Sequence, residues 1–122
     1  PALMEVEEKK FSDPNFRWHK VEETHGGCLL GGDPATMKER GAMASPVNMV
    51  NPGMCPIQIL HGDNDPIVPV EASSERLYQK IVDAGMEDKV EYYVIPGAGH
   101  GTREFFQDAT QELQIAFFDK YL

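Results

Sequence analysis

The sequence has 122 residues, of which 41% are hydrophobic and 25% charged, and its formal net charge is −9 at pH 7. The length fits one domain with a modest core and is too short for two. The acidic balance and the scattered Lys and Arg residues argue against a nucleic-acid ligand, because phosphate binding needs clustered basic side chains. No apolar run approaches the roughly 18 residues of a membrane span, and the first residues do not resemble a signal peptide.

Residues 1–55 are rich in Pro, Gly, Asn and Met and show no sustained helix or strand period. We expect short helices over residues 5–11 and 17–23. A third is expected over Thr36–Ala44, where Asp33 supplies a cap and the following proline is permitted in a first turn. Long irregular stretches are usually functional lids or segments that need a partner. We therefore assign residues 1–55 as a cap-like irregular segment.

Cys28 and Cys55 are the two cysteines of the chain. They have no CxxC spacing and no nearby pair of histidines, which excludes a standard zinc signature. We expect two buried thiols, and a single disulfide stays open as an alternative.

From residue 56 onward the pattern is regular. Residues 56–60 form a short apolar run that predicts a buried strand. Residues 71–84 predict an amphipathic helix that Gly85 ends. Residues 90–95 are rich in β-branched and aromatic side chains and predict a second strand. The last helix is expected from about 102 to 121, with an apolar stripe formed by Phe105, Phe106, Ala109, Leu113, Ala116 and Phe117.

The order strand, helix, strand, helix implies a right-handed crossover and a parallel pair of strands. Parallel strands are normally buried within a sheet of several strands. Two strands do not make such a sheet, so the others must come from elsewhere or from a second copy of this chain. Residues 56–122 are therefore predicted to be the βαβα part of an α/β core.

Polar and glycine-rich loops follow both predicted strands. In an open parallel sheet the ligand site lies beyond the carboxyl ends of the strands, so we expect Asp65 and His100 within hydrogen-bonding reach. A carboxylate bound to one imidazole nitrogen fixes the tautomer and stabilises the cation, and the other nitrogen is free to take a proton from a nucleophile. Asp63 is expected to cap the loop, and His61 to hydrogen-bond backbone at the end of its strand.

These loops resemble the end of an α/β-hydrolase through two motifs, His61-Gly-x-x-Asp65-x-x-Val68-Pro69 and Gly97-x-Gly-His100-Gly101. The resemblance is to the esterase and lipase group that includes carboxylesterases and acetyl-xylan and feruloyl esterases. It extends over residues 29–122, and residues 1–28 match poorly and correspond to a variable cap insertion. The resemblance implies that Asp65 is the acid of a catalytic triad and His100 its base. It also implies a small-molecule ester substrate and no metal or organic cofactor.

In this family the nucleophile precedes the acid and lies in Gly-x-Ser-x-Gly, between a strand and a helix. That motif is absent, and the serines of the chain are Ser12, Ser45, Ser73 and Ser74. We therefore expect the C-terminal half of a serine esterase, inactive alone, which associates with itself or with a missing N-terminal half. The alternatives are a non-catalytic binding or assembly remnant and a part of a serine peptidase of the prolyl-oligopeptidase type.

Three other motifs do not fit their usual chemistry. An EF-hand calcium loop that began at Asp63 would need glycine at its sixth position, where Val68 stands. A dinucleotide loop that began at Gly97 would need a third glycine or alanine where Thr102 stands. His25-Gly26-Gly27 resembles the oxyanion motif of lipases, but it follows no strand, and we expect a flexible turn there.

Overall fold

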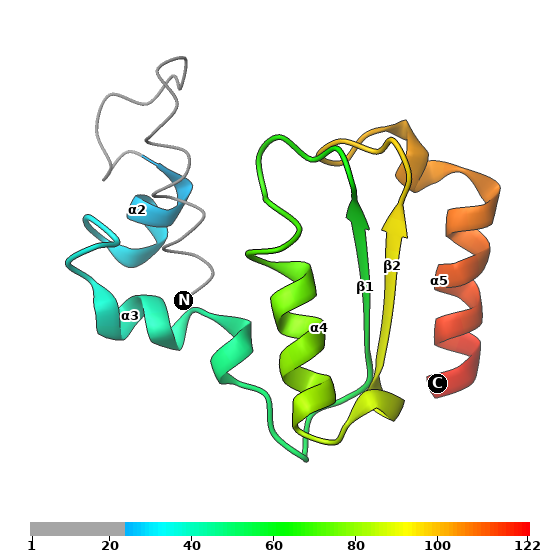
Figure 1. Ribbon diagram of the computed structural model, residues 1–122, viewed down its shortest axis with the longest axis horizontal. Coiled ribbons are helices and arrows are strands. Elements are labelled where there is room, and N and C mark those ends of the chain that lie inside the picture. The colour runs from blue at the N-terminus through cyan, green and yellow to red at the C-terminus, as the bar shows by residue number, and fades with distance from the viewer. Residues whose placement is uncertain (1–23) are drawn as a thin grey trace. The chain divides into compact units, whose positions relative to one another are not determined.

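The computed structural model describes residues 24–122 (Figure 1). The helices predicted over residues 5–11 and 17–23 lie outside this range. The chain divides into two compact units, Pro1–Val50 and Asn51–Leu122. Within residues 24–122, no helix is long and apolar enough to cross a membrane.

In the first unit, helix α2 spans His25–Leu30. The side chain of Thr24 caps it, because its Oγ1 accepts a hydrogen bond of 2.9 Å from the N–H of Gly27. The helix ends at Gly31, whose φ of 76° lies in the left-handed region that glycine adopts without strain. The prediction of a flexible turn at His25-Gly26-Gly27 was therefore wrong, since the preceding threonine starts a helix there.

Helix α3 spans Lys38–Met43 and is followed by the 3₁₀ turn η2, Pro46–Asn48. It begins two residues later than predicted, because Asp33 does not cap it. The Oδ1 of Asp33 instead accepts the N–H of Ala35 at 2.8 Å, which closes a local turn upstream of the helix.

Cys28 and Cys55 are both exposed. Cys28 lies on α2, whose buried residues are Gly26, Gly27 and Leu30. The exposed position of each cysteine shows that the prediction of buried thiols was wrong, and no disulfide joins them.

The second unit contains a parallel two-stranded sheet. Strand β1 is Ile57–Gly62 and strand β2 is Val90–Ile95, and their register runs from the pair Ile57–Val90 to the pair Gly62–Ile95. The predicted parallel pairing is confirmed. Strand β1 continues two residues beyond the apolar run, so His61 belongs to the strand and not to the loop.

Helix α4, Ser74–Asp83, connects the strands and is followed by the 3₁₀ turn η3, Glu87–Lys89. Gly85, at φ 73°, ends α4 in a Schellman motif. Its N–H donates to the carbonyl of Val82, and the next N–H, of Met86, donates to the carbonyl of Ile81. The prediction that Gly85 ends this helix is confirmed.

The C-terminal region has two helical pieces. The 3₁₀ helix η4 is Arg103–Phe106 and helix α5 is Asp108–Tyr121. Gln107 separates them, because its φ of −75° and ψ of 153° are extended. The prediction of one continuous helix was therefore wrong. The sheet stands between α4 and α5 (Figure 1), so the chain has an α/β fold with flanking helices.

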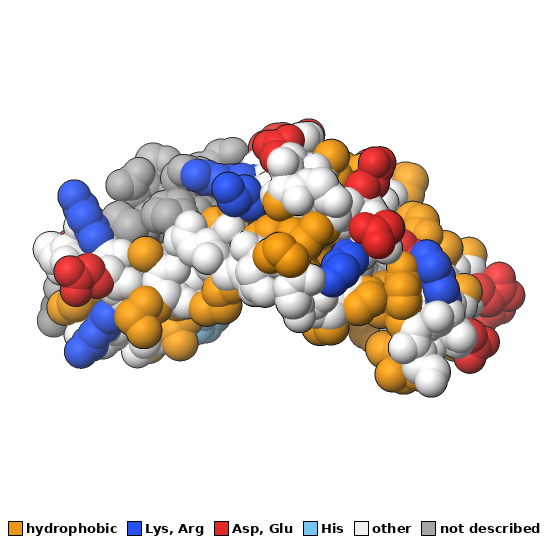
Figure 2. All heavy atoms as spheres, turned by 90° about the horizontal axis from the view of Figure 1, so that it is seen from below, with side chains coloured by type: hydrophobic (Ala, Val, Ile, Leu, Met, Phe, Trp, Pro, Cys, Tyr) orange, Lys and Arg blue, Asp and Glu red, His pale blue; other side chains and the backbone are white. Residues whose placement is uncertain are grey.

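The core of the second unit is small. Its buried apolar side chains come from both helices, both ends of β2 and the neighbouring loops, and they are Ile81, Met86, Val90, Ile95, Ala98 and Phe117. Of the stripe predicted on the last helix only Phe117 is among them, and Phe106 is 70% exposed. Figure 2 shows hydrophobic side chains reaching the surface beside charged ones. A two-stranded sheet offers too little surface to cover both helices.

Candidate functional site

Two loops meet at the carboxyl ends of the strands. The N–H of Asn64, after β1, donates to the carbonyl of Ala98, after β2, at 3.0 Å. In the opposite direction, the N–H of Gly97 donates to Oδ1 of Asp63 at 2.6 Å. The prediction that Asp63 caps this loop region is confirmed, and the two bonds fasten the loops together.

Gly62 permits this close approach. A Cβ at that position would lie 2.2 Å from the carbonyl oxygen of Ala98. Glycine within a strand commonly marks such a place, where another backbone comes near. Ala98 itself is fully buried, so the loop after β2 rests directly on the end of β1.

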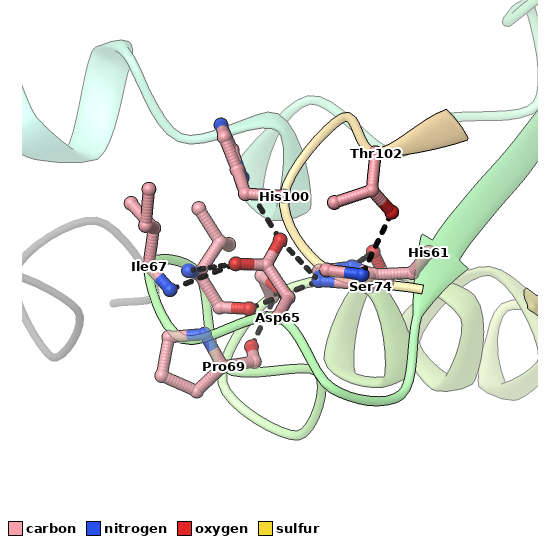
Figure 3. A network of polar contacts seen from close by, with 10 residues as sticks. His61, Asp65, Ile67, Pro69, Ser74, His100 and Thr102 are labelled. Atoms are coloured by element: carbon pink, nitrogen blue, oxygen red, sulfur yellow. Dashed lines mark hydrogen bonds and ion pairs between the residues drawn. The ribbon is translucent and has the colours of Figure 1, made fainter. Parts of the chain in front are cut away.

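Asp65 is held by its own loop and by the loop after β2 (Figure 3). Its Oδ1 accepts the N–H groups of Ile67 and Val68 at 2.8 and 2.9 Å. Its Oδ2 accepts Nδ1–H of His100 at 2.9 Å. Burial by itself would raise the pKa of Asp65, but the hydrogen bonds from Val68, His100 and Ile67 outweigh it, and the pKa lies below the ordinary value. The carboxylate is therefore ionised at neutral pH.

His100 points its ring away from the sheet, and its side chain is 51% exposed. Because the ionised Asp65 can only accept, the proton of a neutral His100 ring is on Nδ1 and Nε2 carries the lone pair. Within residues 24–122 no hydrogen bond to Nε2 is formed. The proximity that the strand order predicts is observed, and the exposed nitrogen is available to take a proton.

Two depressions border the His100 ring. The larger, an open hollow of about 730 Å³, is lined by Asn64, Ile67, Thr102, Arg103 and Glu104 among others. The smaller, of about 290 Å³, lies on the side of the strand end and is lined by Leu60, Val68, Gly101 and Phe105 together with His61 and Asp65. His100 therefore lines accessible space in both depressions.

His61 lies near the end of β1, with its Nε2 3.4 Å from Oδ2 of Asp65, and it is only 7% exposed. Its Nε2 is 2.9 Å from the carbonyl oxygen of Val68, which confirms the predicted bond to backbone. Its Nδ1 is 2.5 Å from Oγ of Ser74, the first residue of α4. Sequence reasoning missed this second contact, and its only signal is the polar serine at the start of the helix.

The other candidate groups lie elsewhere. Ser73 donates to the carbonyl of Pro69. In the first unit, Ser45 is buried and its Oγ has no hydrogen-bond partner among residues 24–122. None of the serines in the described part of the chain forms a hydrogen bond with His100. Residues 24–122 contain no group of three or more His, Cys, Asp or Glu side chains that would hold a metal ion.

The chain is similar to a known protein family. The BD-FAE family model matches residues 3–81, which is more than half of the chain. This range includes Asp65 and ends before His100, and it includes residues 3–28, so the expectation that residues 1–28 lie outside the resemblance was wrong. No curated protein matches the chain. The chain belongs to the BD-FAE family, a family of α/β-hydrolase-type esterases.

Proposed function

We propose that this chain supplies the acid and the base of a serine carboxylic ester hydrolase, with Asp65 as the acid and His100 as the base. The hydrogen bond of 2.9 Å from Nδ1 of His100 to Oδ2 of Asp65 is the observation that carries the proposal. Membership of an esterase family supports the reaction class. The substrate would be a small-molecule ester.

In the proposed reaction a serine outside this chain attacks the ester carbonyl. Nε2 of His100 takes the serine proton as the new C–O bond forms, and Asp65 stabilises the resulting imidazolium. The same nitrogen then gives the proton to the departing alcohol, which leaves an acyl-serine. Water attacks the acyl group with His100 again as base, and the acid and the free serine are released.

We further propose that residues 1–122 are the C-terminal part of a longer hydrolase. None of the four serines, Ser12, Ser45, Ser73 and Ser74, lies in Gly-x-Ser-x-Gly. In α/β-hydrolases the serine precedes the acid and the histidine. The two-stranded sheet supports the same proposal, because parallel strands normally lie inside larger sheets.

The test compares the 122-residue chain with the same chain extended by its upstream coding sequence. We expect a fluorophosphonate probe to label a serine in the extended protein and none in the shorter chain, and hydrolysis of p-nitrophenyl acetate to follow the labelling. In the extended protein, His100→Gln should slow hydrolysis about 10²–10⁴-fold, since it removes the general base. His25→Gln, a histidine in the first unit, is the matched control and should leave the rate unchanged.

A non-catalytic binding or assembly module is the second candidate, and the missing Gly-x-Ser-x-Gly favours it. An upstream sequence without a glycine-flanked serine would support this candidate over the enzyme. Undiminished hydrolysis by the His100→Gln variant would contradict the assigned base. Cleavage of a proline-containing peptide in place of esters would favour a peptidase of the prolyl-oligopeptidase type.

A further inference from the structure

We infer that His61 is a positioning residue, which holds Asp65 in the orientation that His100 requires. The inference rests on the proposed function, because it assigns His61 a task within the Asp65–His100 pair. His61 is a buried titratable side chain at the end of β1 that ester hydrolysis does not use. Its ring joins three elements, namely the strand, the loop after it and helix α4 (Figure 3).

The partners of His61 determine its tautomer. The carbonyl of Val68 can only accept a hydrogen bond, so Nε2 of His61 carries the proton and donates it. In the neutral ring Nδ1 has a lone pair, to which the hydroxyl of Ser74 donates. Both ring nitrogens therefore have a hydrogen-bond partner, which permits the burial of the ring.

The contact with Val68 reaches Asp65 directly. Val68 accepts the bond from His61 through its carbonyl and presents its own N–H to Oδ1 of Asp65. In addition, Nε2 of His61 lies 3.4 Å from Oδ2, the oxygen that accepts from His100. The ring thus supports both oxygens of the carboxylate. It acts on Oδ1 through the backbone of Val68, and it lies beside Oδ2.

Ser74 fixes the ring from the opposite side, at the start of α4. Its neighbour Ser73 also ties α4 to the loop, through a bond of 2.7 Å to the carbonyl of Pro69, and this bond does not involve His61. The two serines therefore form a matched pair. Replacing either by alanine removes one hydrogen bond near the start of the helix, and only Ser74 acts on the imidazole.

Ser74, His61 and Asp65 form a chain of contacts like that of a triad. Ser74 is the first residue of a helix, and it does not line either depression at His100. The proton on Nε2 of His61 is engaged by a backbone carbonyl. Asp65 lies 3.4 Å from the His61 ring, which is farther than the 2.9 Å to His100. These contacts favour support of Asp65 over a second nucleophile.

The experiment follows the Nδ1–H proton of His100 by NMR in the full 122-residue chain. Its downfield resonance reports the hydrogen bond to Asp65, and Asp65→Asn identifies it by abolishing it. In His61→Leu we expect the exchange of this proton with solvent to accelerate about tenfold, as for the loss of a supporting hydrogen bond. His61→Gln, whose side-chain amide can donate to Val68, should restore most of the protection. Ser74→Ala should accelerate exchange, and Ser73→Ala should not.

The outcomes separate the inference from the proposed function. A resonance that Asp65→Asn abolishes and His61→Leu leaves unchanged would overturn the role of His61 and keep the Asp65–His100 pair. If Asp65→Asn leaves the downfield resonance unchanged, the Asp65–His100 pair itself is overturned. If His61→Leu does not fold, the serine variants test the inference. Equal exchange rates of the His100 Nδ1–H proton in Ser74→Ala and Ser73→Ala would then refute it. Labelling of Ser74 by a fluorophosphonate would assign His61 as a base instead.

Discussion

Replacement of Gly62 by alanine tests how closely the two loops of the site pack. The added Cβ would lie 2.2 Å from the carbonyl oxygen of Ala98 and 2.6 Å from its carbonyl carbon. Both atoms belong to the backbone, so no side-chain rotation relieves the contact. The oxygen has to retreat by roughly 1 Å to reach ordinary van der Waals separation.

Two contributions set the size of the effect. Forcing an extra carbon into a packed region costs about 1–3 kcal/mol. Movement of Ala98 also breaks the hydrogen bond from the N–H of Asn64, which contributes about 1 kcal/mol. We therefore expect Gly62→Ala to lower the free energy of unfolding by about 2–4 kcal/mol, a large part of the stability of a typical domain.

Urea unfolding followed by circular dichroism measures the loss. Gly85→Ala is the matched control, because Gly85 has a positive φ and, apart from Gly85 and its two chain neighbours, no atom of the described residues lies within 4 Å of the point that a Cβ would occupy there. This control carries only the backbone penalty, about 1–2 kcal/mol. Hydrogen exchange at the N–H of Asn64 should accelerate in Gly62→Ala and stay unchanged in Gly85→Ala.

An unchanged free energy of unfolding in Gly62→Ala would refute the reasoning, because Gly62 has no positive φ and its whole cost is the contact with Ala98. The same conclusion would follow if the N–H of Asn64 stayed protected in Gly62→Ala. Either result would mean that the loops after β1 and β2 are farther apart in solution than in the structure.

Three further predictions concern charge, capping and surface. Asp65→Asn should lower the free energy of unfolding by about 1–3 kcal/mol at neutral pH. Because the pKa of Asp65 is lowered in the folded state, the ionised carboxylate contributes fully to stability above about pH 4, and this contribution is lost as the pH falls through the lowered pKa. Urea unfolding should therefore show a smaller stability difference between the wild type and Asp65→Asn at pH 3 than at pH 7. Thr24→Ala should cost about 1 kcal/mol by uncapping α2, seen as faster hydrogen exchange at Gly27. Light scattering should show that the chain self-associates. The double variant Ile115→Lys, Phe118→Lys should weaken the self-association, because these apolar side chains are 59% and 55% exposed. A single monomer peak for the wild type would contradict the prediction of self-association.

Local signals predicted part of the second unit, although α4 begins three residues later than the predicted residue 71. Strand β2 has the predicted bounds, because β-branched and aromatic residues dominate Val90–Ile95. The end of α4 follows from Gly85, whose left-handed conformation few other residues adopt. The proximity of Asp65 and His100 follows from the rule that neighbouring parallel strands end at the same edge.

Other features depend on contacts that no local pattern contains. The apolar periodicity of residues 102–121 is compatible with one helix, yet Gln107 is extended and the hydroxyl of Thr110 donates to the carbonyl of Glu104 across the break. Cys28 is exposed because the buried face of the short helix α2 consists of other residues. Composition alone does not specify which face of a short helix is covered.

The sequence by itself determined the two strands, their order and the residues that bring a carboxylate and an imidazole to one edge, because these depend on residue type and chain direction. Only the tertiary structure decided how the carboxylate is held. The bond of His61 to Val68, its bond to Ser74 and the close approach at Gly62 all join residues through the folded backbone. Such contacts depend on small differences in distance, which become fixed only when the elements pack.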